Sequence, residues 1–344
     1  MKAANKASST TPKLFEKPTD GIDHRAHRGH GEILKISSTS VLSVSSVVNL
    51  LEPPRNQMRL PITKTPKCYV GGAFIRSESG RVYAHNDSAG AFACNIPLCT
   101  RKDLRNAVEA AAKAGPGWSK RSAYNRGQIL YRIAEMLESR AGEMSAALAL
   151  TGASPTAAAR EVRASIDRAV HYAGWTDKYE SLLGSVNPVS TPHFNFTVME
   201  PMGVIGILAP EEAPLLGLLS MVLPAIASGN TAIALASHSQ PYPSILLGEI
   251  LAVSDLPGGV VNLLTGTRAD ILPTMATHAH LRAVYAVANK AERTEIQQGA
   301  AEHVKRTIFI NSETPFDWFD EKSQGLYHIR HFLEAKTIWH PIGA

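Results

Sequence analysis

The sequence predicts an α/β fold in which a parallel sheet is covered by helices on both faces. From residue 204 onward, short apolar segments alternate with stretches of helical periodicity. Segments that are apolar on both sides are typical of strands buried between two layers of helices. The strands are predicted at residues 204–208, 231–235, 260–264, 283–288 and 306–310, with helices beginning near Pro214, Pro241, Arg268 and Lys290.

The order of these elements also predicts how the sheet is wound. Connections between parallel strands are right-handed, so the strands and helices form a Rossmann-like, doubly wound sheet. The first strand, residues 204–208, is followed by APEEAP rather than by a GxGxxG pattern. The fold is therefore predicted without the glycine-rich fingerprint that usually accompanies dinucleotide binding.

Residues 68–198 are predicted to form a mainly helical part ahead of the sheet. Their patterns combine helix caps, apolar residues at helical spacing and one alternating strand. The predicted elements are a strand and turn at 69–72, a helix that follows the capping box at 100–103 and ends at Gly115-Pro116-Gly117, a helix from Ser122, a helix over about 155–183, and a strand at 193–198.

Composition limits the classes of function. The chain has 344 residues, of which 44% are hydrophobic and 19% charged, and a formal net charge of +5. The basic residues are mixed with acidic ones, so we expect no nucleic-acid partner. No segment reaches the ~20 apolar residues of a membrane span, so no membrane partner is expected either. Three cysteines without metal-type spacing predict a reducing, cytoplasmic location and no metal site.

The first 57 residues differ from the rest of the sequence. They are rich in serine, threonine, lysine and proline, and they show little sustained periodicity. Such a composition cannot bury enough apolar surface to fold, so residues 1–57 are predicted to be a disordered extension.

Several segments resemble motifs of the aldehyde dehydrogenase superfamily. The resemblance runs from about Cys68 to Ser312 with similar spacing, and it resumes near the C-terminus. The helices at 107–118 and 126–137 are similar to the family's N-terminal helices. The other matching segments are EPMGVIGILAP at 200–210, PAIASGNT at 224–231, DLPGGVVNLLTG at 255–266 and FLEAKTIW at 332–339.

The resemblance implies a division of the chain. Residues 58–312 correspond to the family's N-terminal and cofactor-type domain, and residues 313–344 to a linker and a C-terminal oligomerisation strand. In the family, this strand and the one before the EPxG motif form a small β oligomerisation module. Family activity is the NAD(P)-dependent oxidation of aldehydes.

The cofactor pocket departs from the family pattern. Glu212 stands where the family has its oxyanion asparagine, and a carboxylate would repel the developing charge instead of donating to it. Leu235 replaces the lysine that contacts the cofactor ribose, and His238 replaces the accompanying glutamate. Ala288 stands at a glycine of the turn that borders the cofactor diphosphate. We therefore expect no bound cofactor, and NAD(P) enters by family resemblance only.

The catalytic groups are missing as well. The general-base glutamate aligns with Ile310, or with Phe309 after a shift of one residue. The region that carries the nucleophilic cysteine in the family is absent between Ser312 and the tail. The three cysteines, Cys68, Cys94 and Cys99, precede the first helix and are interpreted as structural. No catalytic residue is assigned, and Pro210, Glu212, Leu235, His238 and Gly266 mark a degenerate pocket.

Three functions remain open. The first is a non-catalytic subunit or pseudoenzyme in a homo-oligomer, or in a hetero-oligomer with a full-length aldehyde dehydrogenase. Phe196, Phe332 and Trp339 are its candidate interface residues. The second is an NAD(P)-dependent oxidoreductase acting on aldehydes. The third is a small-ligand-binding module in which Glu211, Glu212 and His238 line a crevice suited to a cationic ligand.

Overall fold

The computed structural model describes residues 64–343, which belong to one compact unit beginning at Ile62. The predicted extension over residues 1–57 lies outside the described residues, and the boundary predicted between 312 and 313 falls inside the unit. The helices are α1 (Arg101–Ser119), α2 (Ala123–Ser139), α3 (Ala141–Ala149), α4 (Pro155–Ala173), α5 (Tyr179–Leu183), α6 (Leu216–Ala227), α7 (Tyr242–Ala252), α8 (Arg268–Thr277), α9 (Lys290–Ala301) and α10 (Leu326–Arg330). The strands are β1 (Cys68–Val70), β2 (Ala73–Ile75), β3 (Val82–Asn86), β4 (Phe92–Pro97), β5 (Ser185–Asn187), β6 (His193–Pro201), β7 (Val204–Leu208), β8 (Thr231–Leu235), β9 (Val261–Leu264), β10 (Leu281–Ala288), β11 (Arg306–Asn311) and β12 (Leu333–Pro341).

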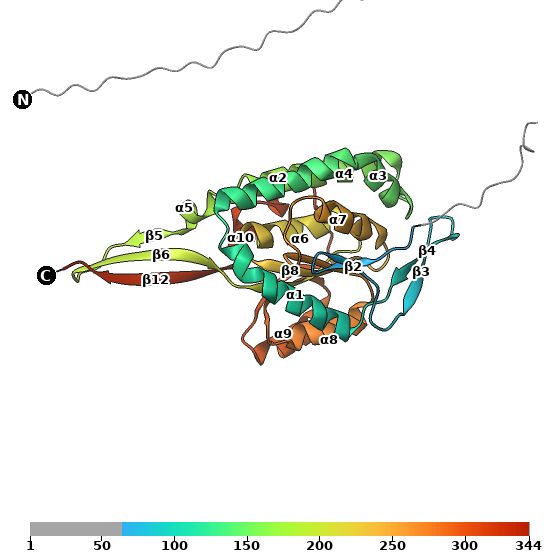
Figure 1. Cartoon of the computed structure of the whole chain (residues 1–344). Coiled ribbons are helices and arrows are strands. Elements are labelled where there is room, and N and C mark those ends of the chain that lie inside the picture. Colours follow the sequence, from blue (N-terminus) through green and yellow to red (C-terminus); the bar gives the residue numbers. More distant parts are fainter. Residues whose placement is uncertain (1–63, 344) are drawn as a thin grey trace, which may run out of the picture. The chain divides into compact units, whose positions relative to one another are not determined.

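The larger sheet confirms the predicted doubly wound fold. Its seven strands follow the order β11-β10-β7-β8-β9-β1-β2, and the strands from β11 to β9 are parallel. The strands β1 and β2 extend one end in the antiparallel direction. Helices α2, α4, α6 and α7 cover one face, and α1, α8 and α9 cover the other (Figure 1). Every residue of β7 and β8 is buried, so the central part of the sheet is covered on both faces.

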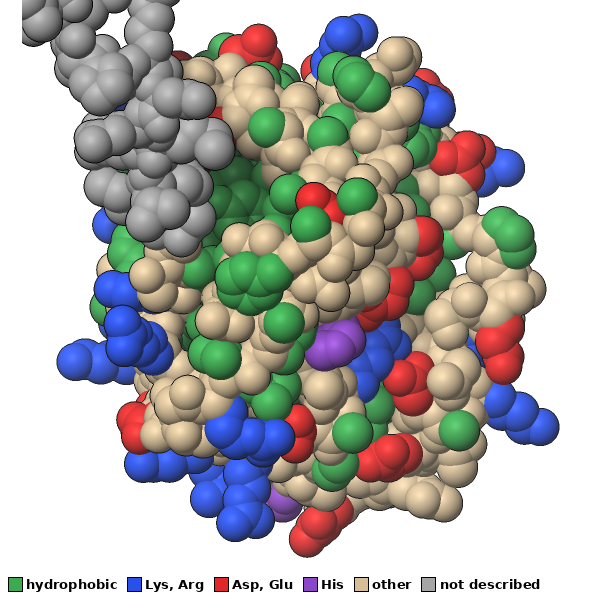
Figure 2. Space-filling view, turned by 90° about the vertical axis from the view of Figure 1, so that its right-hand side faces the viewer, with side chains coloured by type: hydrophobic (Ala, Val, Ile, Leu, Met, Phe, Trp, Pro, Cys, Tyr) green, Lys and Arg blue, Asp and Glu red, His purple; other side chains and the backbone are tan. Residues whose placement is uncertain are grey.

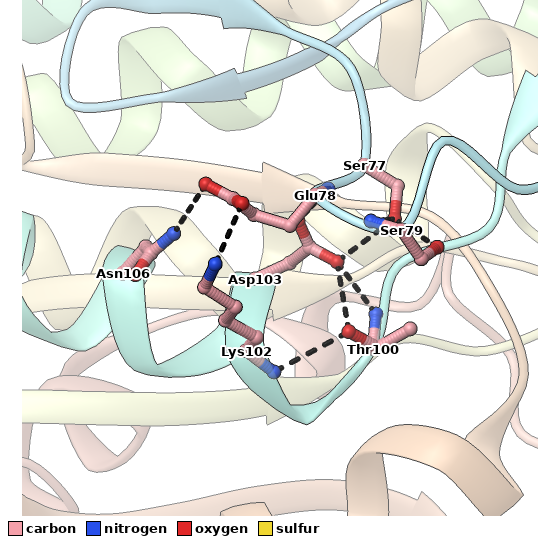
Figure 3. A network of polar contacts seen from close by, with 7 residues as sticks. All are labelled: Ser77, Glu78, Ser79, Thr100, Lys102, Asp103 and Asn106. Carbon is pink, nitrogen blue, oxygen red and sulfur yellow. Dashed lines mark hydrogen bonds and ion pairs between the residues drawn. The ribbon is translucent and has the colours of Figure 1, made fainter.

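Helix α1 begins where the sequence predicts, at a capping box. Asp103, which is fully buried, accepts hydrogen bonds from the backbone N–H of Thr100 at 2.7 Å and of Glu78 at 2.8 Å. The hydroxyl of Ser77 donates to the same carboxylate at 3.0 Å. Figure 3 shows how this network joins the first turn of α1 to the connection between β2 and β3.

The predicted end of α1 at Gly115-Pro116-Gly117 is wrong, because the helix continues to Ser119. Trp118 explains the extension: its ring is buried, and its Nε1 donates to the carbonyl of Ile226 at 2.9 Å. Tertiary packing therefore holds a turn whose local sequence favours an end. The helix predicted over 155–183 is in fact α4 and α5, separated by a turn, and α3 and the β3–β4 hairpin were not predicted.

A second, three-stranded sheet forms an arm beside the main sheet (Figure 1). Its central strand β6 pairs antiparallel with β12 along nine residues and with the shorter β5 on its other side. Directly paired residues share a face, so Phe196 lies with Ile338 and Val186, whereas Trp339 lies with Asn195 on the opposite face. The pairing joins the two strands that the resemblance assigns to the oligomerisation module.

The segment between β11 and β12 is fastened to the main body by Arg168 of α4. Its buried guanidinium donates to the carbonyls of Trp318 at 2.9 Å and Ser323 at 2.8 Å. It also donates to the hydroxyls of Ser323 and of Ser220 in α6. One side chain thus holds this segment against two helices.

Val304 adopts a backbone conformation that valine normally avoids. Its φ of +51° lies in the left-handed region, and the side chain is 92% exposed. The N–H of Lys305 bonds to the carbonyl of Ala300 at 3.1 Å, which closes the C-terminus of α9 around this residue. A branched side chain gains no packing there and strains the turn.

Replacing Val304 by asparagine should raise the free energy of unfolding by about 1 kcal/mol, because asparagine tolerates this conformation. The urea midpoint of the full chain measures the change. Val253→Asn is the matched control, since Val253 is also exposed after a helix but has a φ of −109°. An equal gain in both variants would show that backbone strain is not the cause.

Candidate functional site

The candidate site lies where the direction of the chain reverses across the main sheet. From β7 the chain proceeds through β8 to β9 on one side, and then returns to β10 on the other side of β7. Ligands of doubly wound folds bind at the carboxyl edge of such a switch point. Figure 2 views the molecule from the side on which the parallel strands end, and charged side chains gather around a histidine near the middle of that face.

Arg268 fills the switch point. It is the first residue of α8, and its guanidinium donates to the carbonyl of Ala209 after β7 at 2.9 Å and to that of Val287 in β10 at 2.6 Å. The same group pairs with Glu292 of α9 at 3.0 Å. The two ion-pair side chains are about one-fifth exposed. The protein's own cation therefore spans both strands and carries a carboxylate partner.

A second internal contact occupies the N-terminus of α6, the helix that follows β7. The carboxylate of Glu161 accepts hydrogen bonds from the backbone N–H groups of Leu215 at 3.0 Å and Leu216 at 3.1 Å. Burial raises the pKa of Glu161, although these two bonds act in the opposite direction. A free helix N-terminus can bind phosphate, but this one is already bonded to a side-chain oxygen.

Glu211 joins the loop after β7 to the loop after β8. Its carboxylate accepts from the hydroxyls of Ser237 and Ser239, each at 2.6 Å, and from the backbone N–H groups of His238 and Ser239. Burial alone would raise the pKa of Glu211, but these hydrogen bonds outweigh it, and the pKa lies below its usual range. Both oxygens are thus engaged within the protein.

The ring of His238 is held between two other segments. Its Nδ1 lies 3.1 Å from the carbonyl of Gly266, which requires the tautomer with a proton on Nδ1. The other side of the crevice is closed by Tyr83 of β3, whose ring stacks on His238 at 4.6 Å between centroids. Burial raises the pKa of Tyr83 well above its ordinary value, with the nearby thiols and Glu211 adding to the effect.

The structure brings together only some of the predicted pocket residues. His238 and Gly266 are in contact, whereas Glu212 points away and accepts from Nε1 of Trp318 at 3.3 Å. Leu235 is buried in the core. Pro210 packs so closely on α6 that a Cβ on Gly217 would approach its ring within 2.3 Å.

The two positions that align with the family's general base carry no titratable group. Ile310 and Phe309 lie half-buried in β11, and their hydrocarbon side chains cannot accept a proton. All three cysteines are free and buried. Within residues 64–343 there is also no group of three histidine, cysteine, aspartate or glutamate side chains that could hold a metal ion.

The three predicted interface residues occupy different environments. Phe332 is fully buried and packs on Tyr285 at 5.7 Å between centroids, so the prediction that it meets a partner is corrected. It lies one residue before β12, where the chain leaves the core. Phe196 is half-buried and Trp339 is 57% exposed, on opposite faces of the arm.

Sequence reasoning did not identify Arg268, Glu292 or Glu161 as site residues. Arg268 carried one signal, because a cation at the first position of a helix faces the positive end of the helix dipole. An arginine there needs compensation, and the structure provides it through Glu292 and two carbonyl oxygens. Nothing in the sequence indicates that Glu161 reaches α6 from a helix 54 residues earlier.

No helix within the described residues is both long and apolar enough to pass through a membrane.

A sequence profile of the aldehyde dehydrogenase family matches residues 74–310, which is more than half of the chain.

Similar proteins point in the same direction. Retinal dehydrogenase 2 of Homo sapiens is 28% identical over 276 residues, which cover 78% of this chain and 52% of that protein. Cytosolic 10-formyltetrahydrofolate dehydrogenase of Xenopus tropicalis is 31% identical over 247 residues, covering 69% of this chain and 27% of that protein. The chain thus spans about half the length of the first relative and about a quarter of the second.

Solved structures share the fold. PnpE from Pseudomonas sp. WBC-3 superposes with a TM-score of 0.69 at 25% identity, covering 72% of this chain and 51% of PnpE. The NAD+ complex of aldehyde dehydrogenase from Bacillus cereus superposes with a TM-score of 0.68 at 23% identity, covering 72% and 50%. These structures show the shared fold, and the profile match over residues 74–310 shows that the chain belongs to the aldehyde dehydrogenase family.

Proposed function

We propose that this chain is a non-catalytic member of the aldehyde dehydrogenase family whose role is assembly with another family chain. The observation that carries the proposal is the position of Arg268, which spans the switch point and pairs with Glu292. The Arg268 guanidinium fills the expected cofactor crevice, and Glu292 neutralises its charge. Both features disfavour the binding of a dinucleotide there. The absence of a base and an oxyanion donor at the aligned positions agrees with this.

The residues present do not fit NAD(P). A ligand phosphate at the switch point would have to displace two carbonyl bonds of Arg268 and would face the carboxylate of Glu292. The N-terminus of α6 is taken by Glu161. Leu235 supplies no cation for the ribose, and it is buried in the core.

The purified chain should therefore show no aldehyde-dependent reduction of NAD or NADP, and calorimetric titration should give no dissociation constant in the micromolar range. Each missing charge-assisted hydrogen bond costs roughly 1.5–3 kcal/mol, which is about ten- to a hundred-fold in affinity. Isothermal titration calorimetry measures cofactor binding, and the absorbance of the reduced nicotinamide independently measures activity.

The variant Arg268→Ala distinguishes two roles of this side chain, closing the crevice or binding a cofactor phosphate. If Arg268 closes the crevice, removing it leaves NAD affinity unchanged or raises it. If Arg268 holds a diphosphate, the unmodified chain binds NAD at micromolar concentration and the variant loses about ten-fold or more. The second pattern would contradict the proposal, and Arg282→Ala, an exposed arginine at the start of β10, is the control.

The competing function is an NAD(P)-dependent oxidoreductase acting on aldehydes. It is favoured by the relatives' names and by the NAD+ complex of the Bacillus cereus protein. The same titration decides between the two functions. We regard the cationic-ligand module as less favoured, because the carboxylate of Glu211 is already saturated by hydrogen bonds.

A cytoplasmic location is part of the proposal. All three thiols are free, as expected for a protein kept in a reducing compartment. Fractionation followed by immunodetection would test the location.

The surface proposed for assembly is one face of the arm, here called the Phe196 face. Its apolar side chains are those of Val186, Phe194, Phe196, Val198 and Ile338, and the exposed side chains of Lys336 and His340 share the face. Val186 and Phe194 are exposed, and a shallow groove of about 360 Å³ borders them beside α5. Exposed apolar side chains gathered on one sheet face are typical of an interface, and the partner we propose is a second copy or a full-length aldehyde dehydrogenase.

Charging this face should weaken assembly. We expect the double variant Val186→Glu/Phe194→Glu to reduce association by at least about ten-fold, because each carboxylate would lose its hydration in the contact. Light scattering of the full chain, alone and mixed with a full-length aldehyde dehydrogenase from the native source, measures the effect.

Trp339→Glu is the matched control, since Trp339 is exposed on the opposite face of the same sheet. Weaker association in this control, with the double variant unchanged, would place the interface on the other face. A monomer with no change in any variant or mixture would remove the assembly role.

A further inference from the structure

Two of the buried cysteines form a close pair at the end of the main sheet. Cys68 lies in β1, and Cys99 lies in the connection between β4 and α1. Their sulfur atoms are 3.4 Å apart, although the residues are 31 positions apart in the sequence. The side chains are 1% and 0% exposed, respectively.

Both sulfurs belong to an ordered hydrogen-bond chain. The Thr265 hydroxyl donates to the carbonyl of Pro97 at 2.6 Å, so its oxygen is free to accept from the Cys68 thiol at 3.3 Å. The sulfur of Cys68 then accepts from the Cys99 thiol. The backbone N–H of Cys99 bonds to the carbonyl of Thr265 at 3.0 Å, which fixes the main chain on both sides of the pair.

The hydrogen bond between the thiols makes them chemically unequal. It lowers the pKa of Cys68, and together with burial it raises the pKa of Cys99. This direction makes Cys68 the attacking thiolate in the reaction proposed below. A thiolate beside a neutral thiol is the arrangement from which a sulfenic acid is trapped as a disulfide.

A metal site fits the pair less well. Two sulfurs bound to tetrahedral zinc at about 2.3 Å would lie about 3.8 Å apart, which is wider than the observed separation. Within the described residues no third histidine, cysteine, aspartate or glutamate completes a cluster around them. The two sulfurs, 3.4 Å apart, would approach by about 1.4 Å to form a disulfide bond of about 2.05 Å.

We propose that Cys68 and Cys99 are a redox modification site that forms a reversible intrachain disulfide with hydroperoxides as oxidant. With hydrogen peroxide, the thiolate of Cys68 attacks one oxygen, the O–O bond breaks, and the hydroxide that leaves takes up the proton released when Cys68 ionised, which gives the first water. The thiol of Cys99 then attacks the sulfenic sulfur, its proton passes to the departing hydroxide, and water is released. Two thiols and one hydrogen peroxide give one disulfide and two waters.

The site lies near one end of the main sheet. Strands β1 and β2 have three residues each and form one end of the sheet. Short end strands open locally at lower free energy than central strands, which allows a small neutral oxidant to reach a buried sulfur. The disulfide would tie β1 to the start of α1, beside the Gly266 turn that contacts His238.

The test treats the folded full chain with hydrogen peroxide, blocks remaining thiols, and maps the linked peptides by mass spectrometry. We expect one link, between Cys68 and Cys99, with the loss of two hydrogen atoms per chain and full reversal by a dithiol reductant. Closing this loop should raise Tm by roughly 5 °C. The peptide map on the unmodified sequence needs no variant to fold.

Cys94 provides the matched control. In urea the nearest pair in sequence, Cys94 and Cys99, should link fastest because the loop between them is shortest. Cys94→Ser should leave oxidation of the folded chain unchanged, and Cys68→Ser should abolish the link. The proposal is overturned if the folded chain links Cys94, if it links two chains, or if Cys68 and Cys99 stay thiols while the unfolded chain is fully oxidised.

Discussion

Replacing Arg168 by methionine should lower the free energy of unfolding by about 3 kcal/mol, one of the largest effects expected in this chain. The buried guanidinium donates to Trp318, Ser220 and twice to Ser323, and no carboxylate of residues 64–343 forms an ion pair with it. Methionine fills a similar volume but leaves two buried carbonyl oxygens without these donors. Urea unfolding followed by circular dichroism measures the loss.

Two variants separate geometry from charge at this position. Arg168→Lys keeps the charge but cannot reach four acceptors with one ammonium group, so it should recover less than half of the loss. Arg163→Met, on the exposed side of the same helix, should change the stability by less than about 0.5 kcal/mol. Equal effects at the two positions would refute a special role for the buried guanidinium.

Replacing Asp103 by asparagine should cost about 3 kcal/mol. All four of its hydrogen-bond partners are donors: the N–H groups of Thr100 and Glu78 and the hydroxyls of Thr100 and Ser77. An amide offers only one oxygen and turns its NH₂ group toward donors. The carboxylate also faces the positive end of the α1 dipole, which the neutral amide does not balance.

Glu109→Gln serves as the control for this change, because Glu109 is exposed further along the same helix. We expect less than about 0.5 kcal/mol there. Thermal unfolding of both variants should differ by several degrees. A destabilisation of Asp103→Asn no larger than that of the control would contradict the importance of the network in Figure 3.

The sequence predicts the central strands closely, because their physical signal is local. Residues 204–208 and 231–235 are observed as β7 and β8 with the predicted bounds. An uninterrupted apolar run between turns specifies a buried strand with few alternatives. The end of α1 could not be predicted in this way, because it depends on a pocket for Trp118 formed by a distant helix.

The sequence predicts which positions lie near the candidate site, but it does not predict the contacts that their side chains make. Alignment to the family motifs places Glu212 and His238 near the crevice, yet Glu212 turns toward Trp318 and Glu211 binds the His238 loop. Neighbouring residues in a loop can point in opposite directions, and pattern reasoning gives no rule for which. The Arg268 contacts join three separate elements, so only the folded structure reveals them.

The interface prediction fails at Phe332 for a related reason. Alternation within the tail predicts two faces, but Phe332 precedes β12 and β12 leaves the core only after its first residue, Leu333. A shift of one residue in the start of β12 would decide whether the ring of Phe332 is buried in the core or lies on the arm. The same register separates Phe196 from Trp339, which the sequence treats as one interface.

The pairing of β6 with β12 also has a kinetic consequence. Thr197 and Thr337 meet across the arm although they are 140 residues apart. Closing so long a loop is entropically slow, and the parallel strands β7 to β11 of the main sheet pair over shorter separations. During synthesis β6 must therefore wait, with Phe194 and Phe196 unprotected, until its partner leaves the ribosome. We expect this interval to be the period in which the nascent chain most needs a chaperone.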